Sequence, residues 1–77
     1  MKNIKINLGS IDKVKNFVNT IARFDSDFDL VSGRYVIDAK SIMGIFSLDL
    51  SKPVELAIYN DDEADMVLEA LKDYIVM

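Results

Sequence analysis

Residues 4–8 alternate between apolar and polar side chains, the period of two that predicts a β-strand with one buried face. The alternating residues are Ile4, Lys5, Ile6, Asn7 and Leu8. From Ile11 to about Arg23 the apolar residues recur at helical spacing instead, which predicts an amphipathic helix. Ser10 stands directly before this helix, in the position of an N-cap, where its hydroxyl can accept a hydrogen bond from an amide of the first turn.

The next segment predicts a β-hairpin. After a corner at residues 25–27, Phe28 and Leu30 alternate with aspartates, as in a strand with one buried face. Residues 35–37 are tyrosine, valine and isoleucine, which are strong strand formers. The pair Ser32-Gly33 between the two runs is the expected turn.

A short helix and a last strand follow. The helix is expected from Ser41 to about Leu48. Pro53 then restarts the chain, and because proline cannot donate to a β-ladder, we expect the following strand at an edge position. The apolar residues of that strand are Val54, Leu56 and Ile58.

The final helix is predicted from Asn60 onward. Asn60 is a capping residue, and residues 61–63 place carboxylates in the first turn, where the positive end of the helix dipole favours them. The apolar stripe of this helix consists of Ala64, Val67, Leu68, Leu71, Tyr74 and Ile75. The predicted order of elements is therefore βαββαβα, and we expect the helices to cover one side of a sheet.

Composition restricts the function without naming one. A chain of 77 residues is expected to form one small domain over residues 1–77. It contains no cysteine and no histidine, which excludes disulfides, the usual serine triad and transition-metal sites. The net charge of −4 argues against direct nucleic-acid contact. No segment has the length of a membrane span or of a signal-peptide core, so we expect a cytoplasmic protein without membrane contact.

Carboxylates gather in two groups, at residues 25–29 and at residues 61–63. Neither group follows a calcium-loop pattern, and a solvated acidic face is the expected role of both. Their spacing singles out no pair for acid–base chemistry. We therefore expect no metal, no cofactor and no enzymatic activity.

The run Lys40-Ser41-Ile42-Met43-Gly44 resembles the regulatory serine segment of HPr, the phosphocarrier of the bacterial sugar phosphotransferase system. The resemblance continues through residues 45–48, includes the corner at residues 22–27 and extends over nearly the whole chain. It implies an α+β fold of the HPr type, an open-faced sandwich. In that fold three helices cover one face of a four-stranded antiparallel sheet, and the other face is solvated.

HPr carries its phosphoryl group on a histidine at the start of the first helix, with an arginine two positions later. Ser10 falls at about the place of that histidine and Asp12 at about the place of that arginine. A serine phosphate ester is a poor relay intermediate compared with a histidine phosphoramidate, and a carboxylate repels a transferring phosphoryl group. The resemblance therefore implies a degenerate carrier site, in which Ser10 serves as a helix cap.

The serine of HPr that matches Ser41 is phosphorylated by a dedicated ATP-dependent kinase, and the phosphoserine form acts in carbon catabolite control. A helix N-terminus suits a phosphate, because free backbone amides and the positive dipole end meet it there. The alternative is that Ser41 only caps its helix, as serines often do. The sequence leaves both roles open.

The residues that match the docking surface of the family are Lys40, Ile42, Met43 and Phe46. On so short a helix, Ile45 and Leu48 can face the core while the apolar residues of this surface lie nearer the solvent. The alternative is that some or all of them fill the core of a small domain. The implied partners are cytoplasmic proteins, namely an HPr kinase, a transcriptional regulator or a phosphotransferase-system enzyme.

Three functions remain open at this stage. The preferred one is a regulatory protein-binding module, similar to the catabolite-repression HPr homologues that lack the carrier histidine and keep the serine. The second is a component that transfers phosphoryl groups, against which the complete absence of histidine argues. The third is an HPr fold used for an unrelated interaction, with Ser41 as a cap only.

Overall fold

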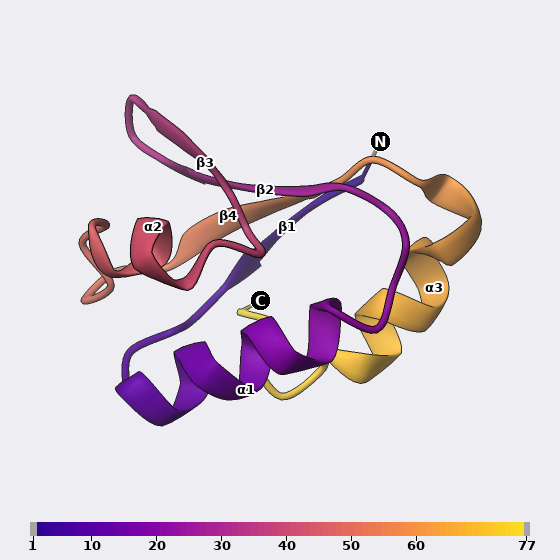
Figure 1. The fold of residues 1–77 in the computed structure, drawn as a ribbon, viewed down its shortest axis with the longest axis horizontal. Coiled ribbons are helices and arrows are strands. Elements are labelled where there is room, and N and C mark those ends of the chain that lie inside the picture. The colour runs from indigo at the N-terminus through magenta and orange to yellow at the C-terminus, as the bar shows by residue number, and fades with distance from the viewer. Residues whose placement is uncertain (1, 77) are drawn as a thin grey trace.

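The computed structural model describes residues 2–76 and contains the predicted elements in the predicted order βαββαβα. The elements are β1 (Lys2–Ile6), α1 (Ile11–Ile21), β2 (Phe28–Ser32), β3 (Tyr35–Asp38), α2 (Ile42–Phe46), β4 (Val54–Ile58) and α3 (Asp61–Ala70). The four strands form one antiparallel sheet in the order β1-β4-β2-β3, and the helices lie on one side of it (Figure 1). The predicted α+β open-faced sandwich is confirmed.

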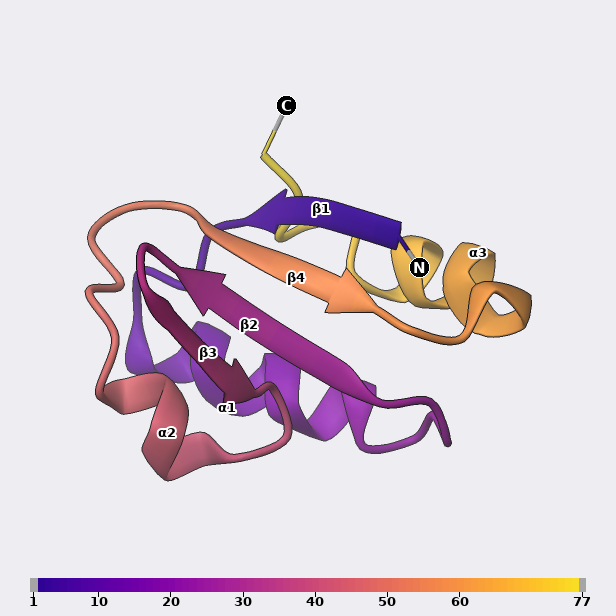
Figure 2. The same ribbon diagram turned by 90° about the horizontal axis from the view of Figure 1, so that it is seen from above.

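The strand register sets which side chains enter the core. Ile4 lies opposite Leu56, Leu56 opposite Leu30, and Leu30 opposite Ile37, so one row of apolar side chains crosses the whole sheet. Because side chains alternate along a strand, this row shares one face of the sheet, and that face is the one the helices cover. Viewed from above, the strands lie over α1, while α2 flanks β3 and α3 flanks β1 and β4 (Figure 2).

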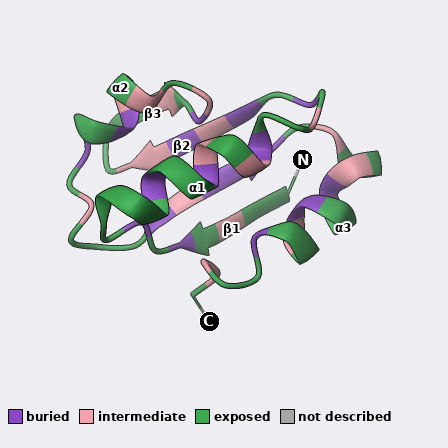
Figure 3. Ribbon diagram, turned by 60° about the horizontal axis from the view of Figure 1, so that its bottom comes forward, coloured by how far each residue is buried: buried purple, intermediate pink, exposed green. Residues whose placement is uncertain are grey.

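Helix α1 covers the centre of the sheet. Ser10 caps it as predicted, because its Oγ accepts a hydrogen bond of 3.2 Å from the amide of Lys13. Val14, Phe17 and Ile21 are fully buried against the strands. Figure 3 shows buried and exposed residues alternating along α1, as expected for an amphipathic helix with one side against the sheet. The helix ends at Ile21, slightly before the predicted end.

The predicted edge position of the last strand is wrong. β4 lies inside the sheet, between β1 and β2. Pro53 directly precedes the first residue of β4, so its missing N–H removes no hydrogen bond from the ladder. A proline just before a strand is therefore compatible with a central strand. The sequence pattern alone did not show whether the strand after Pro53 lies at the edge or in the centre of the sheet.

The ends of two other predicted elements also shift. Strand β1 stops at Ile6, and Leu8, which the alternation placed in the strand, is buried in the connection to α1. The hairpin turn consists of Gly33 and Arg34, because Ser32 pairs with Tyr35. Gly33 adopts a positive φ of 60°, which suits the first central residue of a two-residue hairpin turn and favours glycine there.

The C-terminal segment closes one edge of the sheet. Helix α3 begins after Asn60, whose side chain accepts a hydrogen bond from the Asp62 amide, as the capping prediction required. The predicted apolar stripe continues beyond the helix, and Ile75 forms a β-bridge with Ile6. Residues 74–76 therefore lie along the outer edge of β1.

Candidate functional site

Ser41 is the N-cap of α2, and its side chain is exposed. Its Oγ accepts a hydrogen bond of 3.3 Å from the Gly44 amide, and its carbonyl oxygen accepts one of 3.0 Å from the Ile45 amide. The Ser41 amide donates in turn to the carbonyl oxygen of Asp38 at 3.0 Å. The capping role predicted for Ser41 is thus present in the fold, and the hydroxyl is open to solvent at the start of the helix.

Gly44 provides the space in which Ser41 caps the helix. A Cβ atom at position 44 would lie 3.3 Å from Ser41 Oγ and 3.4 Å from Ile37 Cδ1, closer than most such contacts. The backbone of α2 at Gly44 therefore packs against the side chain of Ile37 from β3. This role of Gly44 was missed in the sequence, where the residue appears only as the last member of a motif.

The apolar residues of α2 divide between core and solvent. Met43 is 79% exposed and Phe46 43% exposed, whereas Ile45 is completely buried. Ile42 is half-buried and packs against the core, so it lies between the exposed Met43 and the fully buried Ile45 in exposure. Leu48 is buried as predicted. Two of the three apolar candidate docking side chains, Met43 and Phe46, are therefore exposed on the helix that Ser41 caps.

Lys40, the fourth candidate docking residue, is half-buried. Its ammonium donates a hydrogen bond of 2.9 Å to the carbonyl oxygen of Phe24 and lies 5.5 Å from the centre of the Phe28 ring. Its amide donates to Asp38 Oδ1 at 2.9 Å. The charge of Lys40 is thus engaged within the fold, and the residue joins the corner before β2 to the start of α2.

The residues of the degenerate carrier site lie in the first turn of α1. Ser10 and Asp12 are both exposed, and Ser10 holds the cap of the helix. Ile11 between them is 62% exposed, a large apolar side chain that the helical pattern had assigned to the core stripe. The start of α1 adjoins the loop after α2, because a Cβ atom on Gly9 would lie 3.9 Å from the Leu50 carbonyl oxygen.

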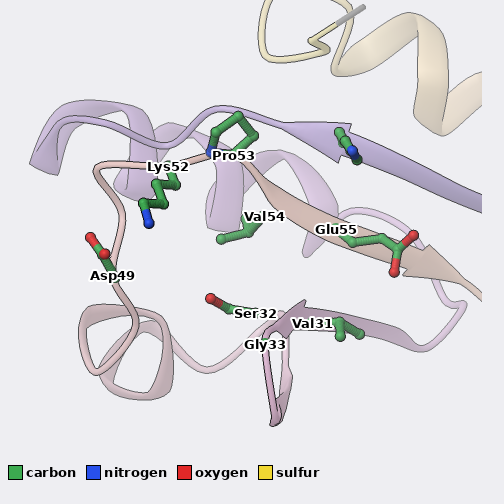
Figure 4. A pocket seen from close by; sticks show the side chains of 9 residues that line it. Val31, Ser32, Gly33, Asp49, Lys52, Pro53, Val54 and Glu55 are labelled. Carbon is green, nitrogen blue, oxygen red and sulfur yellow. The ribbon is translucent and has the colours of Figure 1, made fainter.

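An open hollow of about 560 Å³ lies between the hairpin turn and the start of β4 (Figure 4). Its charged lining residues are Lys5, Asp49, Lys52 and Glu55. Hydrogen bonds from the Ser51 hydroxyl and amide lower the pKa of Asp49, and the hydroxyl bond is 2.6 Å long. The charges of this lining are mixed and open to water, an arrangement that selects no particular ligand.

A second hollow of about 350 Å³ lies at the other end of the sheet and is lined by Asp27, Phe28, Asp29, Asp38 and Tyr59. The Tyr59 hydroxyl donates a hydrogen bond of 2.5 Å to Asp29 Oδ2, and this bond raises the pKa of Tyr59. Within residues 2–76, no three acidic side chains converge closely enough to hold a metal ion. None of the helices described over the same range is both long and apolar enough to cross a membrane.

The chain is thus a small open-faced sandwich whose second helix has a capping serine and two exposed apolar side chains. A family model described as the PTS HPr component phosphorylation site matches residues 12–76. The chain therefore belongs to the HPr family of the phosphotransferase system. Phosphocarrier proteins of this family are not enzymes, so the expectation of a non-enzymatic protein is confirmed. Membership also implies contact with phosphotransferase-system enzymes or an HPr kinase.

Solved structures of the family agree with this assignment. HPr-C-His from Thermoanaerobacter tengcongensis is 32% identical, with 95% of this chain and 89% of that chain covered and a TM-score of 0.78. The phosphocarrier protein HPr of Bacillus anthracis is 27% identical over 97% and 94% of the two chains, with a TM-score of 0.72. The catabolite repression protein Crh of Bacillus subtilis is 29% identical over 96% and 90%, with a TM-score of 0.65.

Proposed function

We propose that this HPr-family protein is a regulatory protein-binding module without phosphocarrier activity, switched by phosphorylation of Ser41. The observation that carries the proposal is the position of Ser41. It is an exposed residue at the start of α2, the short helix that also carries the exposed side chains of Met43 and Phe46. A phosphate there changes the charge next to an apolar docking surface while the buried side of α2 remains in place.

The carrier function is absent in this proposal for a chemical reason. The chain contains no histidine, and a serine, Ser10, stands at about the place of the carrier histidine. The carboxylate of Asp12 lies in the first turn of α1 and repels a phosphoryl group that approaches it. A serine ester at this place would also hold its phosphoryl group too stably for a rapid relay.

The docking surface in this proposal consists of Met43 and Phe46, with Ile42 and Lys40 at its base. Exposed methionine and aromatic side chains make adaptable contacts with a partner, and aromatic residues often dominate such interfaces. Ile42 and Lys40 contribute by holding α2 against the fold, since both are half-buried. The proposed partners are cytoplasmic proteins, namely an HPr kinase and a transcriptional regulator or phosphotransferase-system enzyme that reads the phosphoserine form.

The test is incubation of the purified protein with ATP and an HPr kinase, followed by mass spectrometry. We expect one acid-stable phosphoryl group on Ser41, lost in Ser41→Ala and retained in Ser47→Ala. Ser47 is the matched control because it is an exposed serine at the other end of α2. An unmodified protein, under conditions in which the kinase modifies the HPr of Bacillus anthracis, would contradict the phosphorylation switch.

The description of the family as a phosphorylation site favours a second candidate, participation in phosphoryl transfer. Incubation with enzyme I of the phosphotransferase system and phosphoenolpyruvate separates the two functions. A regulatory module acquires no phosphoryl group in this reaction, whereas a carrier does. Phosphate found on Ser10 and lost in Ser10→Ala would replace the regulatory proposal by the carrier function.

A further inference from the structure

The sheet has two edge strands, and the fold closes one of them. Along β1, the Asn7 amide donates to the Tyr74 carbonyl oxygen at 2.8 Å, and the Val76 amide donates to the Lys5 carbonyl oxygen at 2.9 Å. No strand among residues 2–76 pairs with the outer edge of β3, where the Ser41 amide bonds only the carbonyl oxygen of the last strand residue, Asp38, at 3.0 Å. An open strand edge offers backbone donors and acceptors to another strand.

Two large apolar side chains stand exposed on β3. Tyr35 is 70% exposed although it lies on the helix side of the sheet, and Val36 on the opposite side is 62% exposed. Val36 lies opposite the half-buried Val31 of β2, on the face of the sheet that carries no helix. The two valines therefore form an apolar strip that runs to the open edge.

The backbone of Val36 points out of the sheet. The Ala39 amide donates to the Phe28 carbonyl oxygen at 3.0 Å, which makes these two residues a hydrogen-bonded pair. Hydrogen-bonded and non-hydrogen-bonded pairs alternate in an antiparallel ladder, and the register places Val36 opposite Val31 in a non-hydrogen-bonded pair. Both backbone groups of Val36 therefore point away from β2, towards the free edge.

The sequence of this edge is complementary to itself. In an antiparallel pairing centred on Val36, Val36 of one copy lies opposite Val36 of the other, and Arg34 in the hairpin turn of one copy comes beside Asp38 at the end of β3 of the other. The same charge pair occurs twice because of the two-fold symmetry, and opposite charges placed across a strand pair are favourable. Arg34 and Asp38 are both exposed in this structure. Two like charges at these positions would oppose the pairing, whereas the opposite charges of Arg34 and Asp38 favour it.

We propose that two copies of this chain associate through β3, with antiparallel pairing centred on Val36 and two Arg34–Asp38 ion pairs across the joint. The two sheets then become one continuous sheet of eight strands, and the apolar strip of Val31 and Val36 is covered at its open end. The assembly closes as a dimer because residues 74–76 already occupy the opposite edge of each sheet. The joint is a single short strand pair, so we expect a dissociation constant on the order of 0.1–1 mM.

Sedimentation equilibrium over concentrations up to about 2 mM tests the dimer. Val36→Lys should weaken it at least about tenfold, because it places two ammonium groups face to face at the centre of the joint. Met66→Lys is the matched control, since Met66 is 59% exposed on α3 and lies outside the joint. A protein that stays monomeric at every concentration overturns the proposal. The outer edge of β3 would then be open to pairing only with a strand of a different protein.

A charge exchange tests the register. Arg34→Asp and Asp38→Arg should each dimerise poorly alone, because each places like charges across the joint twice. An equimolar mixture of the two variants should restore the wild-type dimer content, since every facing pair is then of opposite sign. Circular dichroism confirms that each variant is folded. A dimer that Val36→Lys leaves intact, or a mixture that stays monomeric, overturns the proposed joint.

Discussion

The ammonium group of Lys40 lies 2.9 Å from the carbonyl oxygen of Phe24, to which it donates a hydrogen bond. The same group lies 5.5 Å from the centre of the Phe28 ring. The residue directly before Ser41 thus ties the corner between α1 and β2 to the start of α2. Lys40, which was expected to contact a partner, instead holds the start of α2 against the rest of the fold.

Lys40→Met should therefore lower the free energy of unfolding by about 1–3 kcal/mol, because it removes a charged donor from a partly buried carbonyl group. Urea denaturation followed by circular dichroism measures the change. Lys52→Met is the control, since Lys52 is exposed on the loop before β4. Equal stability of the Lys40 variant and the control would show that the Phe24 contact contributes nothing measurable.

The two substitutions commonly used to test a phosphorylation site should affect stability differently at Ser41. Ser41→Ala removes the acceptor of the Gly44 amide and should cost about 1 kcal/mol of stability. Ser41→Asp keeps a capping oxygen and places a negative charge at the helix start, so we expect it to remain close to wild type. Chemical denaturation of both variants measures this difference. If alanine and aspartate were equally tolerated, the cap would have no energetic role.

Ser26 presents the opposite case, a buried hydroxyl whose loss should be harmless. Its Oγ has no hydrogen-bond partner within residues 2–76, although its amide donates to Glu63 Oε1 at 2.9 Å. Ser26→Ala should be neutral or stabilising in thermal denaturation, because it removes an unsatisfied polar atom. Glu63→Ala should instead destabilise the fold by about 1–3 kcal/mol, since it leaves the Ser26 amide without its acceptor. Substantial destabilisation by Ser26→Ala would reveal a hydrogen bond of this hydroxyl.

The contact between Tyr59 and Asp29 predicts an alkaline loss of stability. Only the protonated phenol can donate to the carboxylate, so the hydrogen bond raises the pKa of Tyr59 in the folded protein. An unfolded tyrosine titrates at roughly 10, so the stabilisation is complete below that pH and is lost as the pH rises through the higher folded pKa. The advantage of the wild type over Tyr59→Phe should therefore shrink between about pH 8 and about pH 11.

Unfolding free energies of the two proteins at both pH values measure this effect. Tyr35 and Tyr74 occur in both proteins, so their titration cancels in the difference. A constant difference across this pH range would show that the phenol–carboxylate bond is not formed in solution.

Local patterns in the sequence determined the elements and their order. Alternation identified the strands, helical spacing identified α1 and α3, and Ser10, Ser41 and Asn60 marked the three helix starts. These features depend on residues within one or two turns of each other, so they can be recognised without the tertiary fold. The motif around Ser41 likewise sufficed to predict the family and its four-stranded antiparallel sheet.

Only the tertiary structure decided how residues from distant segments divide between core, anchor and surface. Ile42 and Met43 are adjacent and both apolar, yet one packs against the core while the other is almost fully exposed, because α2 is too short to show a period. Lys40 acts as an anchor because Phe24 and Phe28 lie beside it in space. The central place of β4 and the open edge of β3 follow from strand pairing between distant segments, a property that no local pattern of residues contains.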